Sequence, residues 1–205
     1  MALISSTSRR KYGIVASGDR DMDTTCTPSV RNLYAWEIQE AKRVFAAQLQ
    51  YERIRIHECA AWPNTINRIG TRLKGMEYTG SPNAITLGNN CYFPVRLPSD
   101  LVEASDPQFY KLPWLIHEMT HAWQYQHMGW RYLVMALTTQ LREGAQAYDY
   151  GGEGGLLNGL QQGWKLSHFN LEQQGDITSH YYARIRRDQN VDAWQPYIDE
   201  IQAVA

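Results

Sequence analysis

The stretch LPWLIHEMTHAWQYQHM, residues 112–128, decides how the rest of the chain is interpreted. It contains the pattern HExxH as His117-Glu118-Met119-Thr120-His121. Two histidines four residues apart on a helix lie on one face, one turn apart, so both imidazoles can reach one metal ion. Glu118 projects beside that face, where it can contact a water molecule on the ion. The pattern therefore predicts a zinc site that activates water.

Chance and a purely structural role are the two alternatives for this motif. In a chain of this length with 6 His, random order gives about 0.01 expected occurrences of HExxH. A surface helix with two ordinary histidines is the structural alternative, and large apolar neighbours disfavour it. These neighbours are Trp114, Leu115, Ile116, Ala122 and Trp123.

A catalytic zinc ion takes three protein ligands and keeps an open position for water. Glu172 is the strongest candidate for the third ligand, because Glu172 and Asp176 share a face of a helix that Asn170 can cap. Asp176 then accepts a hydrogen bond from a ligand histidine and selects its tautomer. An acidic helix start favoured by the helix dipole is the structural alternative. The other candidates are Asp149, His127, His168, Asp176 and His180.

The remaining chain predicts an α+β fold, with a small mixed or antiparallel sheet packed on the HExxH helix and a mainly helical C-terminal half. Residues 1–28, rich in Ser, Thr, Asp and Arg, predict a partly ordered arm, and 29–205 predict a single domain. We expect helices over 30–50, 130–141, 170–188 and 192–203, a strand over 51–58, two short strands or one bent strand over 84–95, and loops over 59–82 and 151–163. The glycine-rich 151–163 loop is expected to be mobile.

Composition excludes several classes of protein. The 205 residues carry a formal net charge of −1, which disfavours a general nucleic-acid or membrane-surface binder. No apolar run approaches 18 residues, so no membrane span is expected. The first residues lack the apolar core of a signal peptide. We therefore expect synthesis in the cytoplasm, with any export carried out by a dedicated machine.

The three cysteines, Cys26, Cys59 and Cys91, form no CxxC pair, which disfavours a thiolate zinc site. We expect three reduced thiols, most of them buried. One disulfide with one free thiol is the alternative.

Four segments carry a resemblance that covers roughly residues 30–190. HExxH followed by a helix with Glu-x-x-x-Asp resembles the gluzincins. The segments IRIHE, AITLGNNCYF, LPWLIHEMTHAWQYQ and NLEQQGDI are similar to small neutral zinc metallopeptidase domains of contractile injection systems, including effector domains fused to type VI secretion spike proteins. The resemblance implies a zincin-like fold, His117, His121 and Glu172 as zinc ligands, and Glu118 as catalytic base. One departure is Gly175 inside the ligand helix, which costs up to about 1 kcal/mol and is expected to loosen the third ligand.

The implied activity is hydrolysis of a peptide bond, with Glu118 transferring the proton of the attacking water. The candidates for stabilising the transition state are Tyr148, Tyr150, His168 and His180, each with a structural role as its alternative. The resemblance also implies that the substrate adds as a strand near 84–95, at AITLG or CYFPV, with 151–163 as a lid.

Three interpretations of the function follow. The first is a zinc peptidase that acts as a secreted antibacterial effector, with a spike or an immunity protein as partner. The second is a weakly active or inactive docking module of a contractile apparatus that zinc only stabilises. The intact Glu118 disfavours this module, because a structural zinc site needs no such carboxylate. The third is an amidase that uses the same chemistry on peptidoglycan.

Overall fold

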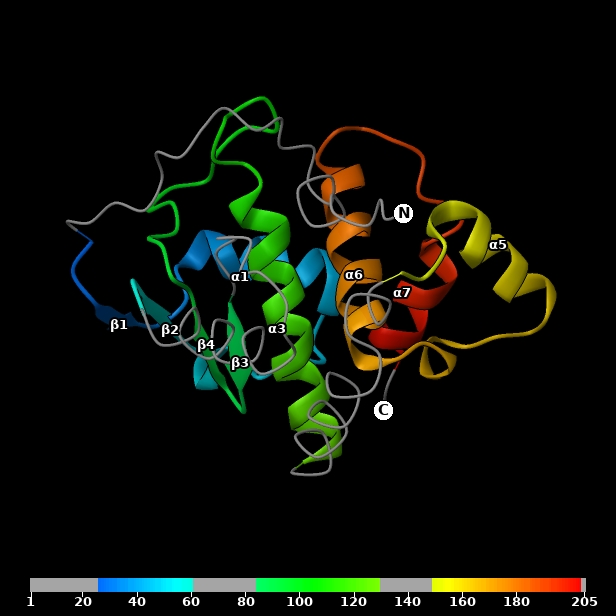
Figure 1. Cartoon of the computed structure of the whole chain (residues 1–205), viewed down its shortest axis with the longest axis horizontal. Coiled ribbons are helices and arrows are strands. Elements are labelled where there is room, and N and C mark those ends of the chain that lie inside the picture. Colours follow the sequence, from blue (N-terminus) through cyan, green and yellow to red (C-terminus); the bar gives the residue numbers. More distant parts are fainter. Residues whose placement is uncertain (1–25, 61–83, 130–148, 204–205) are drawn as a thin grey trace, which may run out of the picture.

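A computed structural model describes residues 26–60, 84–129 and 149–203, and it places a small sheet beside a group of helices (Figure 1). The strand order is β1-β2-β4-β3. The β1–β2 and β3–β4 pairs are antiparallel and the β2–β4 pair is parallel, so the sheet is mixed. The strands are β1 (Ser29–Arg31), β2 (Arg55–Glu58), β3 (Ile85–Leu87) and β4 (Asn90–Tyr92).

One face of the sheet is buried against the long helix α3 (Lys111–Met128). The register pairs Ile56 with Cys91 and Cys91 with Thr86, and all three side chains are buried. Side chains alternate between the two faces of a strand, so this row points to one side. Residues 84–95 contain two short strands, the first of the two expected alternatives, and their hairpin turns at Gly88, which has a φ of 65°. The hairpin thus brings β3 to one edge of the described sheet.

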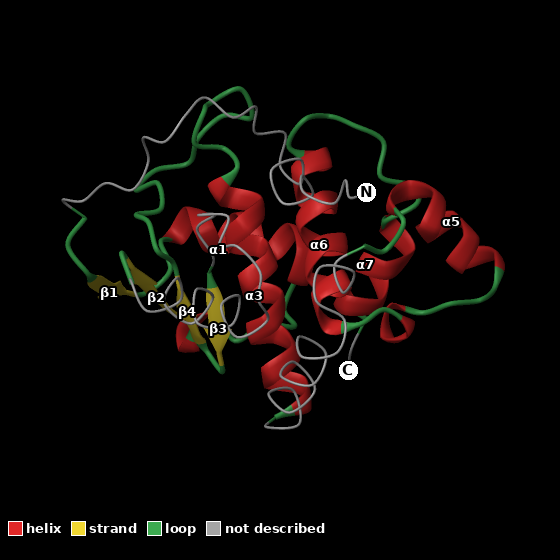
Figure 2. Ribbon diagram, in the orientation of Figure 1, coloured by secondary structure: helices red, strands yellow, loops and turns green. Residues whose placement is uncertain are grey.

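The helix α3 lies between the sheet and α6, and α1 packs against α6 and α7 (Figures 1 and 2). The chain is therefore an α+β fold with a mainly helical C-terminal half, as predicted. None of the helices among the described residues is long and apolar enough to cross a membrane. The remaining helices are α1 (Ala35–Phe45), η1 (Tyr51–Arg53), α5 (Gly152–Gln161), η3 (Leu166–His168), α6 (Leu171–Ile185) and α7 (Gln195–Gln202).

The predicted helix over 30–50 is wrong at both ends. Val30 lies in β1, paired with His57, and α1 runs only over Ala35–Phe45. Glu37 sets the helix start, because its carboxylate accepts the Tyr34 backbone N–H at 2.7 Å. The predicted strand over 51–58 is also shorter, since its first residues form η1. The hydrogen bond of Glu37 thus delays the start of the first helix, and the 3-10 turn η1 replaces the first residues of the expected strand.

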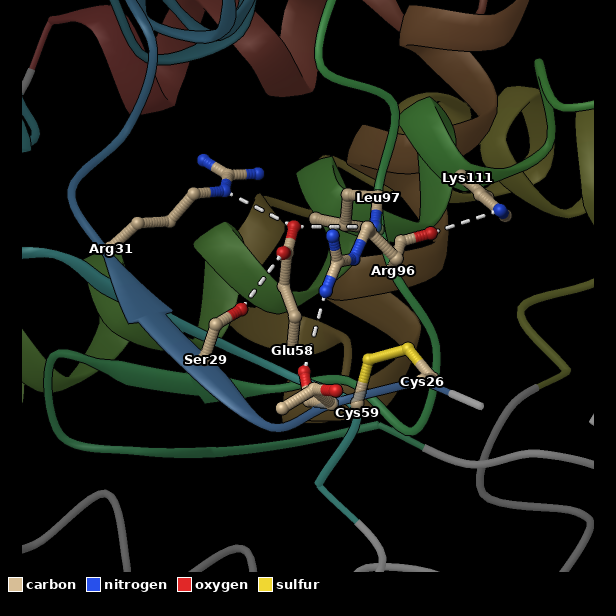
Figure 3. Close-up of a disulfide and its surroundings, with 9 residues drawn as sticks. Cys26, Ser29, Arg31, Glu58, Cys59, Arg96, Leu97 and Lys111 are labelled. Atoms are coloured by element: carbon tan, nitrogen blue, oxygen red, sulfur yellow. Dashed lines mark hydrogen bonds and ion pairs between the residues drawn. A yellow bond between two sulfur atoms is a disulfide. The ribbon is translucent and has the colours of Figure 1, made fainter. Parts of the chain in front are cut away.

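The expectation of three reduced thiols is wrong. Cys26 and Cys59 form a disulfide with a Cα–Cα distance of 5.6 Å (Figure 3). Cys91 is free and buried. Antiparallel pairing of Ser29 with Glu58 explains the bond, because it brings the residue after β2 beside the segment that precedes β1.

Glu58 reinforces the same junction. Its carboxylate accepts hydrogen bonds from Ser29 Oγ at 3.3 Å, Arg31 Nε at 3.1 Å and the Leu97 backbone N–H at 3.3 Å (Figure 3). A buried carboxylate needs such partners, and three donors supply them. β1 is thus held by a disulfide, by backbone pairing and by this carboxylate.

The mobile loop expected over 151–163 is also wrong, since most of it forms α5. Close packing explains two of the glycines, and a positive φ accounts for Gly151, Gly152 and Gly163. A Cβ at Gly155 would meet the Tyr150 carbonyl, and one at Gly159 would lie 2.8 Å from the Tyr197 hydroxyl. Leu156 is fully buried and anchors the helix. The helix 130–141, most of the loop 59–82 and residues 1–25 of the arm lie outside the described residues.

Candidate metal centre

The helix α3 carries His117 and His121 on the face that packs against α6. Both side chains are buried, and their rings meet edge to face with centroids 4.8 Å apart. The two Nε2 atoms approach each other to 3.1 Å. The spacing of four residues thus produces the shared face that the sequence predicts.

Glu172 enters this site from the first turn of α6. Its Oε2 lies 3.4 Å from His117 Nε2 and 3.7 Å from His121 Nε2. The cap that starts α6 is the predicted one. Asn170 accepts the Gln173 backbone N–H at 2.9 Å, and the Gln173 side chain accepts the Asn170 N–H at 3.0 Å. This capping box fixes the turn on which Glu172 lies.

Asp176 lies one turn further along α6 and is almost completely buried. Its Oδ1 is 3.0 Å from His117 Nδ1. A carboxylate at this distance favours a proton on Nδ1, which leaves the Nε2 lone pair of His117 facing the site. This is the supporting role that the sequence predicts for Asp176.

The carboxylates make the site strongly attractive to positive charge. Burial alone would lower the pKa of His117, but the carboxylates of Asp176 and Glu172 outweigh it and raise this pKa to about 10. The pKa of His121 is also raised, because Glu172 outweighs burial. Burial would raise the pKa of Glu172, but His121 and His117 hold it well below its usual value. A cation is therefore favoured where these side chains converge.

His117, His121 and Glu172 are the one group of metal-ligating side chains found among the described residues, with one donor atom from each within 4.8 Å of the others. Two imidazole nitrogens and one carboxylate oxygen form the donor set of many catalytic zinc sites. The two Nε2 atoms lie 3.1 Å apart, close enough for both to bind one cation through their lone pairs once they are deprotonated. The residues present thus fit a divalent metal ion such as zinc.

Two buried polar contacts of the HExxH helix are not predicted from the sequence. Gln124 Oε1 lies 2.9 Å from His121 Nδ1 and accepts its hydrogen bond, because an amide oxygen can only accept. Thr86 donates its hydroxyl to Glu118 Oε2 at 2.7 Å. The spacing of Gln124 three residues after His121 is the signal that points to the first contact. No sequence signal points to Thr86, because it belongs to a distant strand.

The predicted transition-state candidates separate into three groups. Tyr150 and His180 form a pair, with the Tyr150 Oη 2.6 Å from His180 Nδ1, and Trp194 Nε1 donates to the same hydroxyl at 3.2 Å. His168 is exposed and its Nδ1 accepts the Lys165 backbone N–H. Tyr148 lies outside the described residues.

The other candidate ligands do not join the three donors. His127 is exposed, with its Nδ1 2.8 Å from the Trp123 carbonyl at the end of α3. Asp149 is exposed and accepts the Gly151 backbone N–H at 2.8 Å. His180 contacts Tyr150, and Asp176 contacts His117 from the side away from Nε2. Glu172 therefore stands as the third member of the cluster.

The sequence of this chain is similar to part of one curated protein. No protein-family model matches the chain, and no solved structure matches it. The type VI secretion system spike protein VgrG2b of Pseudomonas aeruginosa is 30% identical over 152 residues. The match covers 74% of this chain and 13% of that much longer protein. The chain is therefore similar to a limited part of a type VI secretion spike protein.

Proposed function

We propose that this chain is a zincin-like, gluzincin-type zinc peptidase domain. One observation carries the proposal: His117, His121 and Glu172 converge on one point, and the next residue on the same helix, Glu118, is a buried carboxylate. Such a carboxylate has no use in a purely structural zinc site, which disfavours the docking module. The same groups also suit a peptidoglycan amidase, because both reactions cleave an amide.

His117, His121 and Glu172 are the residues that hold the ion. When bound, zinc supplies Lewis-acid chemistry that polarises a carbonyl oxygen and makes water more acidic. Thr86 holds Oε2 of Glu118 by a hydrogen bond, which leaves Oε1 to take the proton of the attacking water. The water oxygen bonds to the carbonyl carbon, the C–N bond breaks, and Glu118 delivers the proton to the leaving nitrogen.

The substrate is expected along β3 rather than β4. The segment CYFPV begins in β4, which is paired with β2 on one side and β3 on the other. AITLG contains β3, which is the edge strand among the described residues. A peptide can add to an edge strand through backbone hydrogen bonds. β3 also carries Thr86, so a bound peptide would lie beside Glu118.

The similarity to a type VI secretion spike protein supports the delivery part of the proposal. We propose that a contractile secretion apparatus exports this domain as an effector, with the spike as carrier and an immunity protein as antagonist. Detection of the protein outside cells with an intact apparatus, and its loss when the apparatus is disrupted, tests this route.

Glu118→Gln tests the chemistry, because glutamine keeps the shape of the side chain and an oxygen for Thr86 but cannot take up the proton. We expect the variant to keep one zinc ion per chain and to lose about 10²–10⁴-fold in kcat. Zinc is measured by elemental analysis, and hydrolysis with a library of quenched fluorescent peptides and with purified peptidoglycan.

His117→Ala is the matched variant that should lose both zinc and hydrolysis. Peptide cleavage identifies the peptidase, and cleavage of peptidoglycan alone identifies the amidase. Hydrolysis by Glu118→Gln at the wild-type rate would show that the proposed mechanism is wrong.

A further inference from the structure

Two buried glutamines join the HExxH helix to the beginning of α6. Gln124 is completely buried on α3, and Gln174 is 8% exposed on α6. Gln124 Nε2 donates to the Leu171 carbonyl at 3.1 Å and to Gln174 Oε1 at 2.9 Å. Neither residue is a metal ligand or touches the reacting atoms in the proposed function. Their position between two ligand-bearing helices raises the question of what they do.

The hydrogen bonds determine which way each amide points. Gln174 Nε2 donates to the carbonyls of Phe169 at 2.8 Å and Leu166 at 3.3 Å. A carbonyl can only accept, so the Gln174 amide nitrogen must face them and its oxygen must face Gln124. Gln124 must then direct its own nitrogen toward Gln174 and toward the Leu171 carbonyl. Its oxygen is left facing His121.

This orientation selects one tautomer of His121. Gln124 Oε1 lies 2.9 Å from His121 Nδ1 and accepts a hydrogen bond, so Nδ1 must carry the proton. The Nε2 lone pair then faces His117 Nε2 at 3.1 Å and Glu172 Oε2 at 3.7 Å. Asp176 favours the same tautomer of His117, with a carboxylate oxygen rather than an amide oxygen beside Nδ1.

We propose that Gln124 and Gln174 form a relay that positions His121 for metal binding, an inference that rests on the proposed metal centre. The relay starts at backbone carbonyls before α6 and ends on the imidazole, so the tautomer of His121 is set by the backbone that also holds Glu172. Leu171, which accepts from Gln124, directly precedes Glu172. The same hydrogen bonds therefore keep two ligands on different helices in register.

Substitutions at Gln124 separate positioning from packing. Gln124→Met keeps the length of the side chain but removes the acceptor for His121, and we expect about 10–100-fold weaker zinc binding. Gln124→Glu keeps an oxygen toward His121 and loses only the two donor bonds to Leu171 and Gln174, so we expect a smaller loss of zinc affinity than in Gln124→Met. Its metal-free form should still unfold at a lower temperature, because a carboxylate cannot donate to Leu171 and Gln174. Zinc affinity is measured by competition with a chromophoric chelator.

The control is Gln126→Leu on the same helix. The wild-type Gln126 side chain forms hydrogen bonds with Asn89 and with the Gln50 backbone, away from His121. We expect wild-type zinc affinity from this variant. If Gln124→Met does not fold, Gln174→Met tests the next link, with a smaller loss because the Leu171 carbonyl still orients Gln124.

Two results would overturn the relay. One is wild-type zinc affinity in Gln124→Met or, where that variant fails to fold, in Gln174→Met. The other is an equal loss in Gln124→Met and Gln124→Glu. Failure of the wild-type protein itself to bind zinc is a different result, because it contradicts the metal centre of the proposed function.

Discussion

At the scale of single residues, Gly175 decides how closely the two ligand helices approach. A Cβ at this position would lie 2.7 Å from His117 Cε1 and 2.9 Å from His117 Nδ1. The imidazole therefore lies directly against the backbone of α6. The sequence alone treats Gly175 as a weak point of the helix, whereas the structure shows that it has a packing role against His117. The missing side chain is what lets His117 reach Asp176 and Glu172 at the observed distances.

Gly175→Ala should damage the site even though alanine is the better helix former. Propensity alone would stabilise the helix by about 1 kcal/mol. The added methyl group must instead displace the His117 ring, and we expect at least tenfold weaker zinc binding and a lower melting temperature. Gly154→Ala in α5 is the matched control, because a Cβ there meets nothing within 4 Å. Equal zinc affinity in Gly175→Ala and wild type would contradict this account.

Thr86 is the second residue with a specific expected effect. Its hydroxyl holds Glu118 Oε2 at 2.7 Å, and the Glu118 carbonyl lies further away at 3.1 Å. Thr86→Val keeps the shape but removes the donor, so kcat should fall about tenfold with little change in KM. Thr86→Ser should retain most of the activity. Unchanged kcat in Thr86→Val, with zinc content equal to wild type, would show that this hydrogen bond does not serve catalysis.

At the scale of elements, β1 is the part of the sheet with the least support of its own. It has three residues and pairs only with β2 among the described strands. So short a strand gains little from its backbone hydrogen bonds alone. The disulfide Cys26–Cys59 compensates for this by anchoring the segment before β1, and the Glu58 carboxylate holds both Ser29 and Arg31.

Removing the disulfide should therefore lower stability measurably. The bond closes a loop with a sequence separation of 33 residues, for which chain entropy gives about 3–4 kcal/mol. We expect the double variant Cys26→Ser/Cys59→Ser to unfold at a lower denaturant concentration than the oxidised wild type. Reducing agent should destabilise the wild type to the same level and leave the double variant unaffected. If the reducing agent also destabilised the double variant, the loss of stability would not come from the Cys26–Cys59 disulfide.

At the scale of the whole molecule, Glu40 ties the N-terminal helix to the C-terminal half. On α1, its Oε2 accepts from Tyr182 Oη at 2.7 Å and from Arg186 Nη1 at 2.6 Å, both on or next to α6. Arg43 donates to Oε1 at 3.0 Å. Burial would raise the pKa of Glu40, but Tyr182, Arg186 and Arg43 outweigh it and lower the pKa below its ordinary value. Ionised Glu40 therefore stabilises the assembled fold.

This lowered pKa gives the protein a specific sensitivity to acid. Ionised Glu40 stabilises the fold fully when the pH is above 4.5, the pKa of the group in the unfolded chain. This stabilisation disappears as the pH falls through the lower pKa that the group has in the folded protein. Glu40→Gln should cost about 3 kcal/mol near pH 7, because it leaves Arg186 without its buried partner. The difference from wild type should shrink below pH 4.5. Urea unfolding across this range measures it, and a constant difference would contradict the assignment.

The residues of the metal centre could be named from the sequence because their signals are local. The helical repeat places His117 with His121, and Glu172 with Asp176, on shared helix faces, and the resemblance to gluzincins singles out Glu172 among the candidate third ligands. The presence of strands and helices also follows, since alternating and helical periods are local patterns, but the choice between a mixed and an antiparallel sheet does not. The glycine content of 151–163 predicts a mobile loop, but most of the segment forms α5, where Gly155 and Gly159 have no room for a side chain.

By itself, then, the sequence determined which side chains can bind a metal and which helices carry them. The tertiary structure alone decided that Thr86 meets Glu118, that Gln124 meets Gln174, and that Cys26 meets Cys59. The physical reason is the range of the forces involved. Helical spacing acts over four residues, whereas these contacts join residues 32, 50 and 33 positions apart and exist only once strands and helices have packed.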